Sequence, residues 1–154
     1  MSFLSVVKSV VNKVTTLTYS PSNPIILPDS NIMWESGAVG ITTYPIIYVK
    51  SSYWAGLSTA LKAVFMNHEN THLSQQKSNV ALYALKYAID KTYRLSMEVE
   101  AYGAEVTYYI GLGYSKAVVL NMIATLLASS TYLNMCTYAQ AIAALKAKYP
   151  KLLV

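Results

Sequence analysis

Cysteine and arginine are almost missing from this sequence, and their scarcity excludes several kinds of small protein. The single cysteine, Cys136, can form no internal disulfide and leaves no cysteine framework for a structural zinc site. Charged residues make up only 12% of the 154 residues, and Arg94 is the one arginine. Because the lysines are scattered along the chain, the net charge of +5 does not indicate a nucleic-acid partner.

The sequence also has no apolar run long enough for a transmembrane span. The nearest candidate, residues 117–133, is short, and Asn121 and Thr125 interrupt it. Residues 1–17 predict an amphipathic helix rather than a secretory signal, since lysines break the apolar run. Such a helix packs on the core, docks onto other subunits of an assembly, or lies on a membrane surface, and the residues leave these alternatives open.

What remains is a chain that is 54% hydrophobic and contains fourteen tyrosines, which is typical of one folded domain. We expect a single domain over residues 1–154, with a proline-rich loop at 18–37 and a core at 38–154. The loop contains one short extended piece at 25–27. The β-branched and aromatic residues that follow predict edge strands at 38–43 and 46–50, with Pro45 at an edge or a hairpin bend.

Beyond residue 50 the apolar pattern has a helical period. Leu57, Leu61, Phe65, His68 and His72 recur at three- and four-residue steps, which places both histidines on the inward face of one helix. Further helices are predicted from Ser78 to Lys91, from Ser96 to the glycines 111 and 113, after Ser115, and from Thr137 with Gln140 as a capping box to Pro150. The fold class is therefore mainly α (α+β), a helical core with a small edge strand or hairpin.

The only two histidines of the chain lie four residues apart in the segment "HENTHLSQQ". On a helix, His68 and His72 share one face, so both imidazoles can reach one metal ion. Glu69 follows the first histidine and can act as a general base beside the metal's open position. The alternative is a polar helix end at which the two histidines only make hydrogen bonds.

A catalytic zinc site takes three protein ligands and keeps a fourth position for water. Because the chain has no third histidine and no cysteine cluster, a carboxylate must complete the set. Three of the remaining acids fall in "MEVEAYGAE", namely Glu98, Glu100 and Glu105. Glu98 and Glu100 point to different sides of a helix, so only one of them can bind the metal.

These segments resemble the gluzincin metallopeptidases, the group that includes thermolysin. The closer resemblance is to small H-E-x-x-H domains of bacterial and tailed-phage proteins, and it covers about residues 38–109. It implies that His68, His72 and Glu98 bind Zn²⁺ and that Glu69 is the general base. Tyr102 stands where the family has an aspartate that orients a histidine ligand, so either a backbone carbonyl or another acid, such as Glu105, takes that role or the site is weakened.

The expected function is therefore that of a zinc-dependent metallopeptidase acting on a peptide or protein. Since no further histidine is present, a tyrosine, Arg94 or a backbone N–H must stabilise the oxyanion, and Tyr102 and Tyr132 are the candidate tyrosines. The strand at 46–50 would pair with the extended substrate. The alternative is a structural or virion-associated assembly protein with a structural or vestigial zinc site, and a membrane-active protein is a third option. Localisation stays open between the virion and the cytoplasm.

Overall fold

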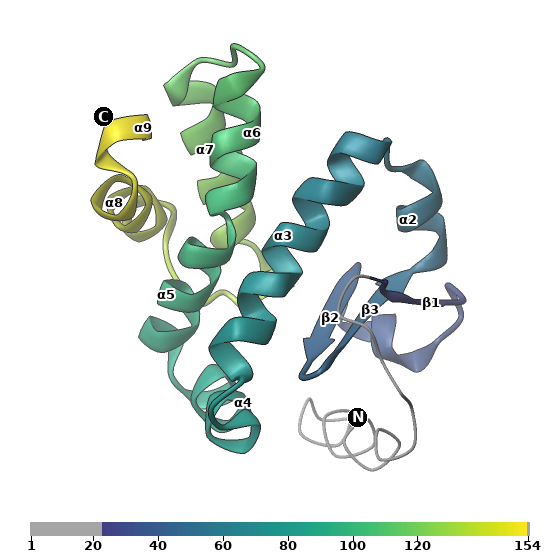
Figure 1. Cartoon of the computed structure of the whole chain (residues 1–154). Coiled ribbons are helices and arrows are strands. Elements are labelled where there is room, and N and C mark those ends of the chain that lie inside the picture. Colours follow the sequence, from purple (N-terminus) through teal and green to yellow (C-terminus); the bar gives the residue numbers. More distant parts are fainter. Residues whose placement is uncertain (1–22, 154) are drawn as a thin grey trace. The chain divides into compact units, whose positions relative to one another are not determined.

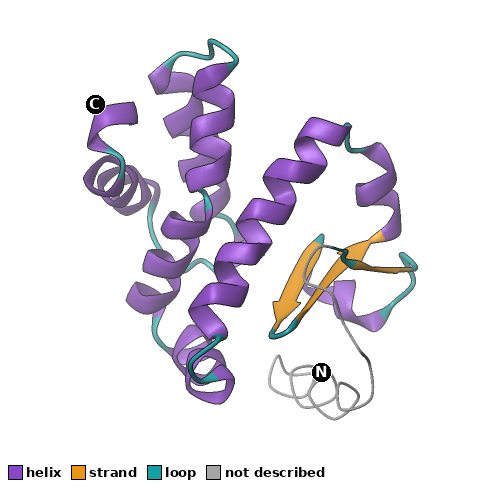
Figure 2. Cartoon of the chain, viewed as in Figure 1, coloured by secondary structure: helices purple, strands orange, loops and turns teal. Residues whose placement is uncertain are grey.

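The computed structural model describes residues 23–153, so the helix expected at 1–17 lies outside the described residues. The structure is 67% helical with a small three-stranded sheet, which confirms the mainly α (α+β) class (Figures 1 and 2). The chain forms two compact units, one ending at Ile89 and one beginning at Asp90, and each is described by itself. The single domain expected over residues 1–154 stays a prediction.

The first unit contains a sheet with the strand order β1-β3-β2. Strand β3 (Ile46–Lys50) pairs in parallel with β1 (Ile25–Leu27) and antiparallel with β2 (Gly40–Thr43). The prediction of an edge strand at 46–50 was therefore wrong, and β3 is the central strand. The Tyr44–Pro45 peptide bond is cis. Because Pro45 lies in the turn before β3, it removes no hydrogen bond between β2 and β3. The extended piece at 25–27 and the edge position of β2 are confirmed.

Helices of the first unit pack against this sheet. A 3₁₀-helix, η2 (Ile32–Ser36), precedes β2, and β3 is followed by α2 (Ser51–Gly56), α3 (Thr59–Gln76) and α4 (Val80–Ile89). The apolar core combines Ile47 and Val49 of β3 with Phe65 and Leu73 of α3. The cap of α4 is Asn79 rather than the expected Ser78, because the Asn79 side chain accepts from Leu82 N at 2.9 Å.

The second unit is entirely helical within its described residues. Its elements are α5 (Lys91–Ala101), α6 (Gly103–Gly111), α7 (Lys116–Leu127), η3 (Ser130–Tyr132), α8 (Tyr138–Lys148) and α9 (Pro150–Leu153). The core side chains include Val106, Val119, Leu127, Ala141 and Leu145, all with no exposed surface. Apolar residues from α6, α7 and α8 thus form one continuous core for this unit.

Cap positions in the second unit test the predicted helix boundaries. Ser115 caps α7, and Thr137 with Gln140 forms the expected capping box of α8. The predicted start after Ser96 was wrong, because the Asp90 side chain accepts from Tyr93 N and α5 begins at Lys91. Arg94 therefore lies inside α5, one turn before Glu98. Pro150 does follow α8, as expected, and it also begins α9.

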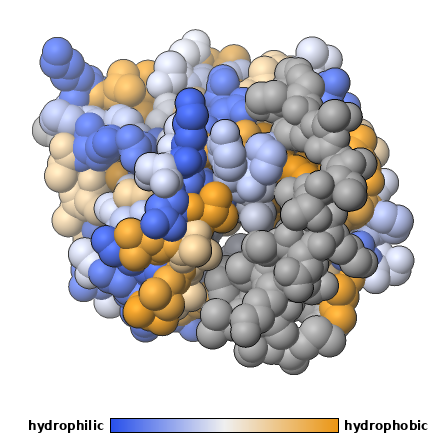
Figure 3. Space-filling view, turned by 60° about the horizontal axis from the view of Figure 1, so that its bottom comes forward, coloured by the Kyte–Doolittle hydropathy of each residue, from blue (hydrophilic) through white to orange (hydrophobic). Residues whose placement is uncertain are grey.

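Apolar residues also reach the surface of the described chain. On the face shown in Figure 3, hydrophobic residues lie in small groups among polar ones where grey atoms do not cover them. On α7, Val118, Met122 and Leu126 follow one another at four-residue steps and are 49%, 37% and 44% exposed. No helix within residues 23–153 has both the length and the hydropathy of a membrane span.

The junction of α5 and α6 depends on one tyrosine. Tyr149 donates its hydroxyl to the carbonyl oxygens of Val99 at 2.8 Å and Glu100 at 3.0 Å. A Cβ atom on Gly103 would lie 2.7 Å from the Tyr149 hydroxyl, so a larger residue at the start of α6 would displace that hydroxyl. Burial, with the nearby Glu100 and Glu105, raises the pKa of Tyr149 to about 12, which keeps the phenol protonated as a donor.

We therefore predict that Tyr149→Phe lowers the free energy of unfolding by about 1–2 kcal/mol, because two helix carbonyls lose their donor. Urea unfolding measures the change, and Tyr114→Phe, at a tyrosine 51% exposed, is the control with a change within about 0.5 kcal/mol. The pKa of Tyr149 is higher in the folded than in the unfolded chain. The contribution of Tyr149 to the free energy of unfolding is therefore complete below its unfolded-state pKa of about 10 and is lost as pH rises to about 12. A Phe variant as stable as the parent at neutral pH contradicts this assignment.

Candidate metal centre

Helix α3 buries a row of polar side chains on the face that carries Phe65 and Leu73. His68, Glu69 and His72 are each 7% exposed, and Gln76 is 4% exposed. These positions follow the three- and four-residue steps of one helical face. A buried polar group without a partner costs about 1–3 kcal/mol, so each member of this row requires a hydrogen bond or a cation.

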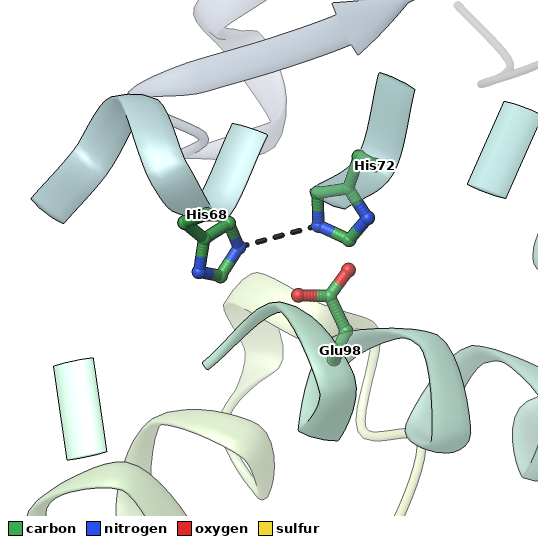
Figure 4. Close-up of side chains that lie close together, drawn as sticks. All are labelled: His68, His72 and Glu98. Carbon is green, nitrogen blue, oxygen red and sulfur yellow. Dashed lines mark hydrogen bonds between the residues drawn. The ribbon is translucent and has the colours of Figure 1, made fainter. Parts of the chain in front are cut away.

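The two histidines face one another across one helical turn (Figure 4). His72 Nε2 lies 3.2 Å from His68 Nε2, and the ring planes are inclined at 69°. Two ligands that are each about 2.0–2.1 Å from a tetrahedral zinc ion stand about 3.3–3.4 Å apart. The observed separation is that of a hydrogen bond between the two rings, and it also fits a pair of imidazole ligands of one ion.

The remaining ring nitrogen of His72 is held by uncharged groups. Its Nδ1 lies 2.9 Å from Gln75 Oε1 and 3.2 Å from the hydroxyl of Tyr83, which comes from α4. The described partners of His72 Nδ1 are thus an amide oxygen and a hydroxyl, and the expectation that an acid or a backbone carbonyl orients a histidine ligand stays a prediction. An amide oxygen takes this position, because Gln75 follows His72 by three residues on the same helix.

Glu98 is the acid of the candidate metal-binding group. It lies on α5 and is 2% exposed. One ligand atom each from His68, His72 and Glu98 lies within 4.8 Å of the other two, so this buried group could hold a metal ion (Figure 4). Glu100 is exposed and forms an ion pair with Lys148 at 3.6 Å. Of the two acids that the sequence left open, Glu98 is therefore the one in the group that could hold a metal ion.

Glu69 is directed toward β2. Its Oε2 accepts a hydrogen bond from the Thr42 hydroxyl. Its Oε1 lies against Gly40, where an added Cβ would be 2.9 Å from that oxygen and 2.5 Å from Phe65 Cζ. The strand thus fixes the carboxylate from one side, and the glycine makes the close approach possible.

Gln76 attaches the end of α3 to the outer edge of β2. Its Nε2 donates to Thr42 O at 3.0 Å, and its Oε1 accepts from Tyr44 N at 2.8 Å. The Gln76 amide therefore makes the donor and acceptor bonds that a neighbouring strand would make along this part of the β2 edge. Sequence reasoning missed Gln76, Gln75, Thr42 and Tyr83, although the two glutamines directly follow the histidine motif on the same helix.

The proposed oxyanion donors lie in the second unit. The hydroxyls of Tyr102 and Tyr132 are 2.7 Å apart and hydrogen-bonded to each other, and the rings meet edge to face. Arg94 is 3% exposed and donates from Nη1 to the carbonyl oxygen of Tyr132 at 3.4 Å. On α5, Arg94, Glu98 and Tyr102 follow one another at four-residue steps, so they form one buried polar face of that helix. The catalytic role of the two tyrosines stays a prediction.

We predict that Gly40→Ala destabilises the first unit by about 1–3 kcal/mol, because the new methyl group displaces Phe65 and the Glu69 carboxylate. Urea unfolding measures the loss. Gly56→Ala is the matched control, since a Cβ at Gly56 meets nothing within 4 Å. Equal stability of Gly40→Ala and the parent would contradict the close packing of α3 on β2.

No family model, curated protein or solved structure matches this chain. Two imidazoles and one carboxylate are the ligand set of catalytic zinc sites that keep a fourth position for water. His68, His72 and Glu98 thus form a candidate metal centre.

Proposed function

We propose that this chain is a zinc-dependent metallopeptidase. The observation that carries the proposal is the buried group of His68, His72 and Glu98, with ligand atoms within 4.8 Å of one another. The chain's only two histidines are both in it, and the carboxylate that completes it lies far along the sequence. A polar helix end that only makes hydrogen bonds requires no such convergence of three metal-ligating side chains.

The donor set suits zinc in number and kind. Two imidazole nitrogens and one carboxylate oxygen would hold the ion, and the 3.2 Å separation of the two Nε2 atoms agrees with adjacent tetrahedral positions. Zinc, when bound, supplies a Lewis acid that lowers the pKa of water to about 7 and polarises a carbonyl group. Burial of the three side chains excludes bulk water and strengthens electrostatic effects at the reacting group.

Glu69 supplies the general base. The Thr42 hydroxyl donates to Oε2 and holds the carboxylate, which would accept a proton from the attacking water. The proton is then available for the leaving amine of the peptide. Strand β2 is an edge strand of the described sheet, and an extended peptide would pair with it near Gly40, before the stretch that Gln76 covers.

The metal assignment predicts different outcomes for two glutamates on the same helix. Glu98→Gln replaces an anionic ligand by a neutral one, and we expect zinc content to fall from one ion per chain to well below one after dialysis. Glu100→Gln is the matched control, because Glu100 is exposed and pairs with Lys148, and this variant keeps its zinc. Elemental analysis of tag-free protein measures the metal. Loss of zinc in both variants, or in neither, contradicts the assignment.

The catalytic assignment predicts that Glu69→Gln retains zinc and loses about 10²–10⁴-fold in kcat/KM, because the amide cannot accept the proton. Release of labelled fragments from an unstructured protein such as casein measures activity, and the metal-free parent is the blank. The amide can still accept from the Thr42 hydroxyl, so folding is preserved. Equal hydrolysis by the Gln variant and the parent would refute the general-base role.

A second candidate function is that of an assembly component in which zinc is structural. The apolar stripe of Val118, Met122 and Leu126 on α7 favours it, since a helix face of this kind is typical of protein contacts. Zinc retained by the parent and by Glu69→Gln, with no hydrolysis by either, supports this function. Hydrolysis by the parent alone supports the peptidase.

A further inference from the structure

The surroundings of His72 Nδ1 determine where the proton of this ring lies. Gln75 Oε1, at 2.9 Å, is a carbonyl oxygen and can only accept, so Nδ1 must carry the hydrogen. A bare Nδ1 would place two lone pairs against each other at that distance. The Tyr83 hydroxyl, which lies 3.2 Å from Nδ1, donates its own hydrogen to Gln75 Oε1 at 3.4 Å. The three groups thus form one consistent set of hydrogen bonds.

From this geometry we propose that Gln75 and Tyr83 are positioning residues that fix His72 as the Nδ1–H tautomer. This tautomer leaves the lone pair of Nε2 directed toward His68, where the metal would bind. The statement about the tautomer concerns the metal-free chain, whereas its consequence for metal binding rests on the proposed function. The polar clamp, defined as Gln75 and Tyr83, replaces the acid that the sequence led us to expect.

Both members of the polar clamp are held by their own elements. Gln75 extends from α3 one turn beyond His72, and the first turn of α4 brings Tyr83 to the same ring. Tyr83 is 8% exposed, and its ring stacks on Tyr87 at 5.6 Å. The connection between the helices is closed by the bond from Asn79 N to Gln76 O at 3.1 Å. His72 is therefore oriented within the first unit before any ion binds.

An amide orients a ring differently from a carboxylate. Both accept from Nδ1–H, but the carboxylate also adds a negative charge that makes the imidazole a stronger ligand. Gln75 therefore provides orientation without charge. It follows that Gln75→Glu strengthens metal binding, while Gln75→Leu, which removes the acceptor, weakens it.

The tautomer can be measured directly, because the chain has only two histidines. Long-range ¹H–¹⁵N correlation spectra of tag-free, metal-free protein are recorded well above the ordinary histidine pKa of about 6.5. His68→Ala assigns the signals. We expect the Nδ1–H pattern for His72 in the parent and a shift toward the Nε2–H form in Gln75→Leu. An Nε2–H pattern in the parent, or the same pattern in both proteins, overturns the proposal.

Zinc titration tests the consequence for the metal. We expect Gln75→Leu and Tyr83→Phe to weaken binding, by about 10–100-fold for Gln75→Leu, and Gln75→Glu to bind at least as tightly as the parent. Tyr87→Phe, on the same helix, is the control and keeps the parent's affinity. The rescue by glutamate separates orientation from a general loss of folding. Parent protein that binds no zinc refutes the proposed function and leaves the tautomer result standing, whereas zinc binding that is unchanged in Gln75→Leu refutes the role of the polar clamp.

Discussion

The burial of four polar side chains along α3 is the constraint on which the rest of the first unit depends. A helix that faces a core normally presents apolar residues there, yet His68, Glu69, His72 and Gln76 are all at most 7% exposed. Each buried polar group left without a partner would cost about 1–3 kcal/mol, so the surrounding elements must supply partners at fixed places. Strand β2 and the turn after it supply hydrogen-bond partners for Glu69 and Gln76, and Gln75 supplies one for His72. A cation would bind at the facing Nε2 atoms of the two histidines.

This constraint explains why β2 has its particular residues. Glu69 and Gln76 are separated by two helical turns, about 10 Å along the axis of α3. In an extended strand, alternate residues repeat about every 6.6–6.8 Å, so Gly40 and Thr42 of β2 and Tyr44, in the turn that follows, can meet successive turns of the helix. Gly40 permits the close approach of Phe65 and Glu69, Thr42 offers both its hydroxyl and its carbonyl, and Tyr44 offers its N–H. The pairing register of the hairpin and the position of the Glu69 side chain therefore depend on each other.

Much of the centre could be predicted from the sequence because its ligands obey local rules. Spacing alone puts His68 and His72 on one face and allows only one of Glu98 and Glu100 to join them, whereas the choice of Glu98 came from the family resemblance. The start of α5 could not be fixed in this way, since Ser96 and Asp90 are both good caps and only the bond to Tyr93 N decides between them. Thr42 and Tyr83 come from other elements, so their roles depend on tertiary structure. Gln75 was within reach of sequence reasoning, because it lies three residues after His72 on the same helix.

In the second unit, Tyr102 stands at the position where the family resemblance leads us to expect an acid. Tyr102 occupies the helical position one turn after Glu98, and its hydroxyl is engaged by Tyr132. A phenol in that pairing provides neither the charge nor the acceptor strength that a carboxylate would bring to an imidazole. The orienting role at His72 is instead taken within the first unit by an amide, one turn along α3. A neutral acceptor built into the same helix can therefore orient the ring of His72, which is the role we propose for Gln75.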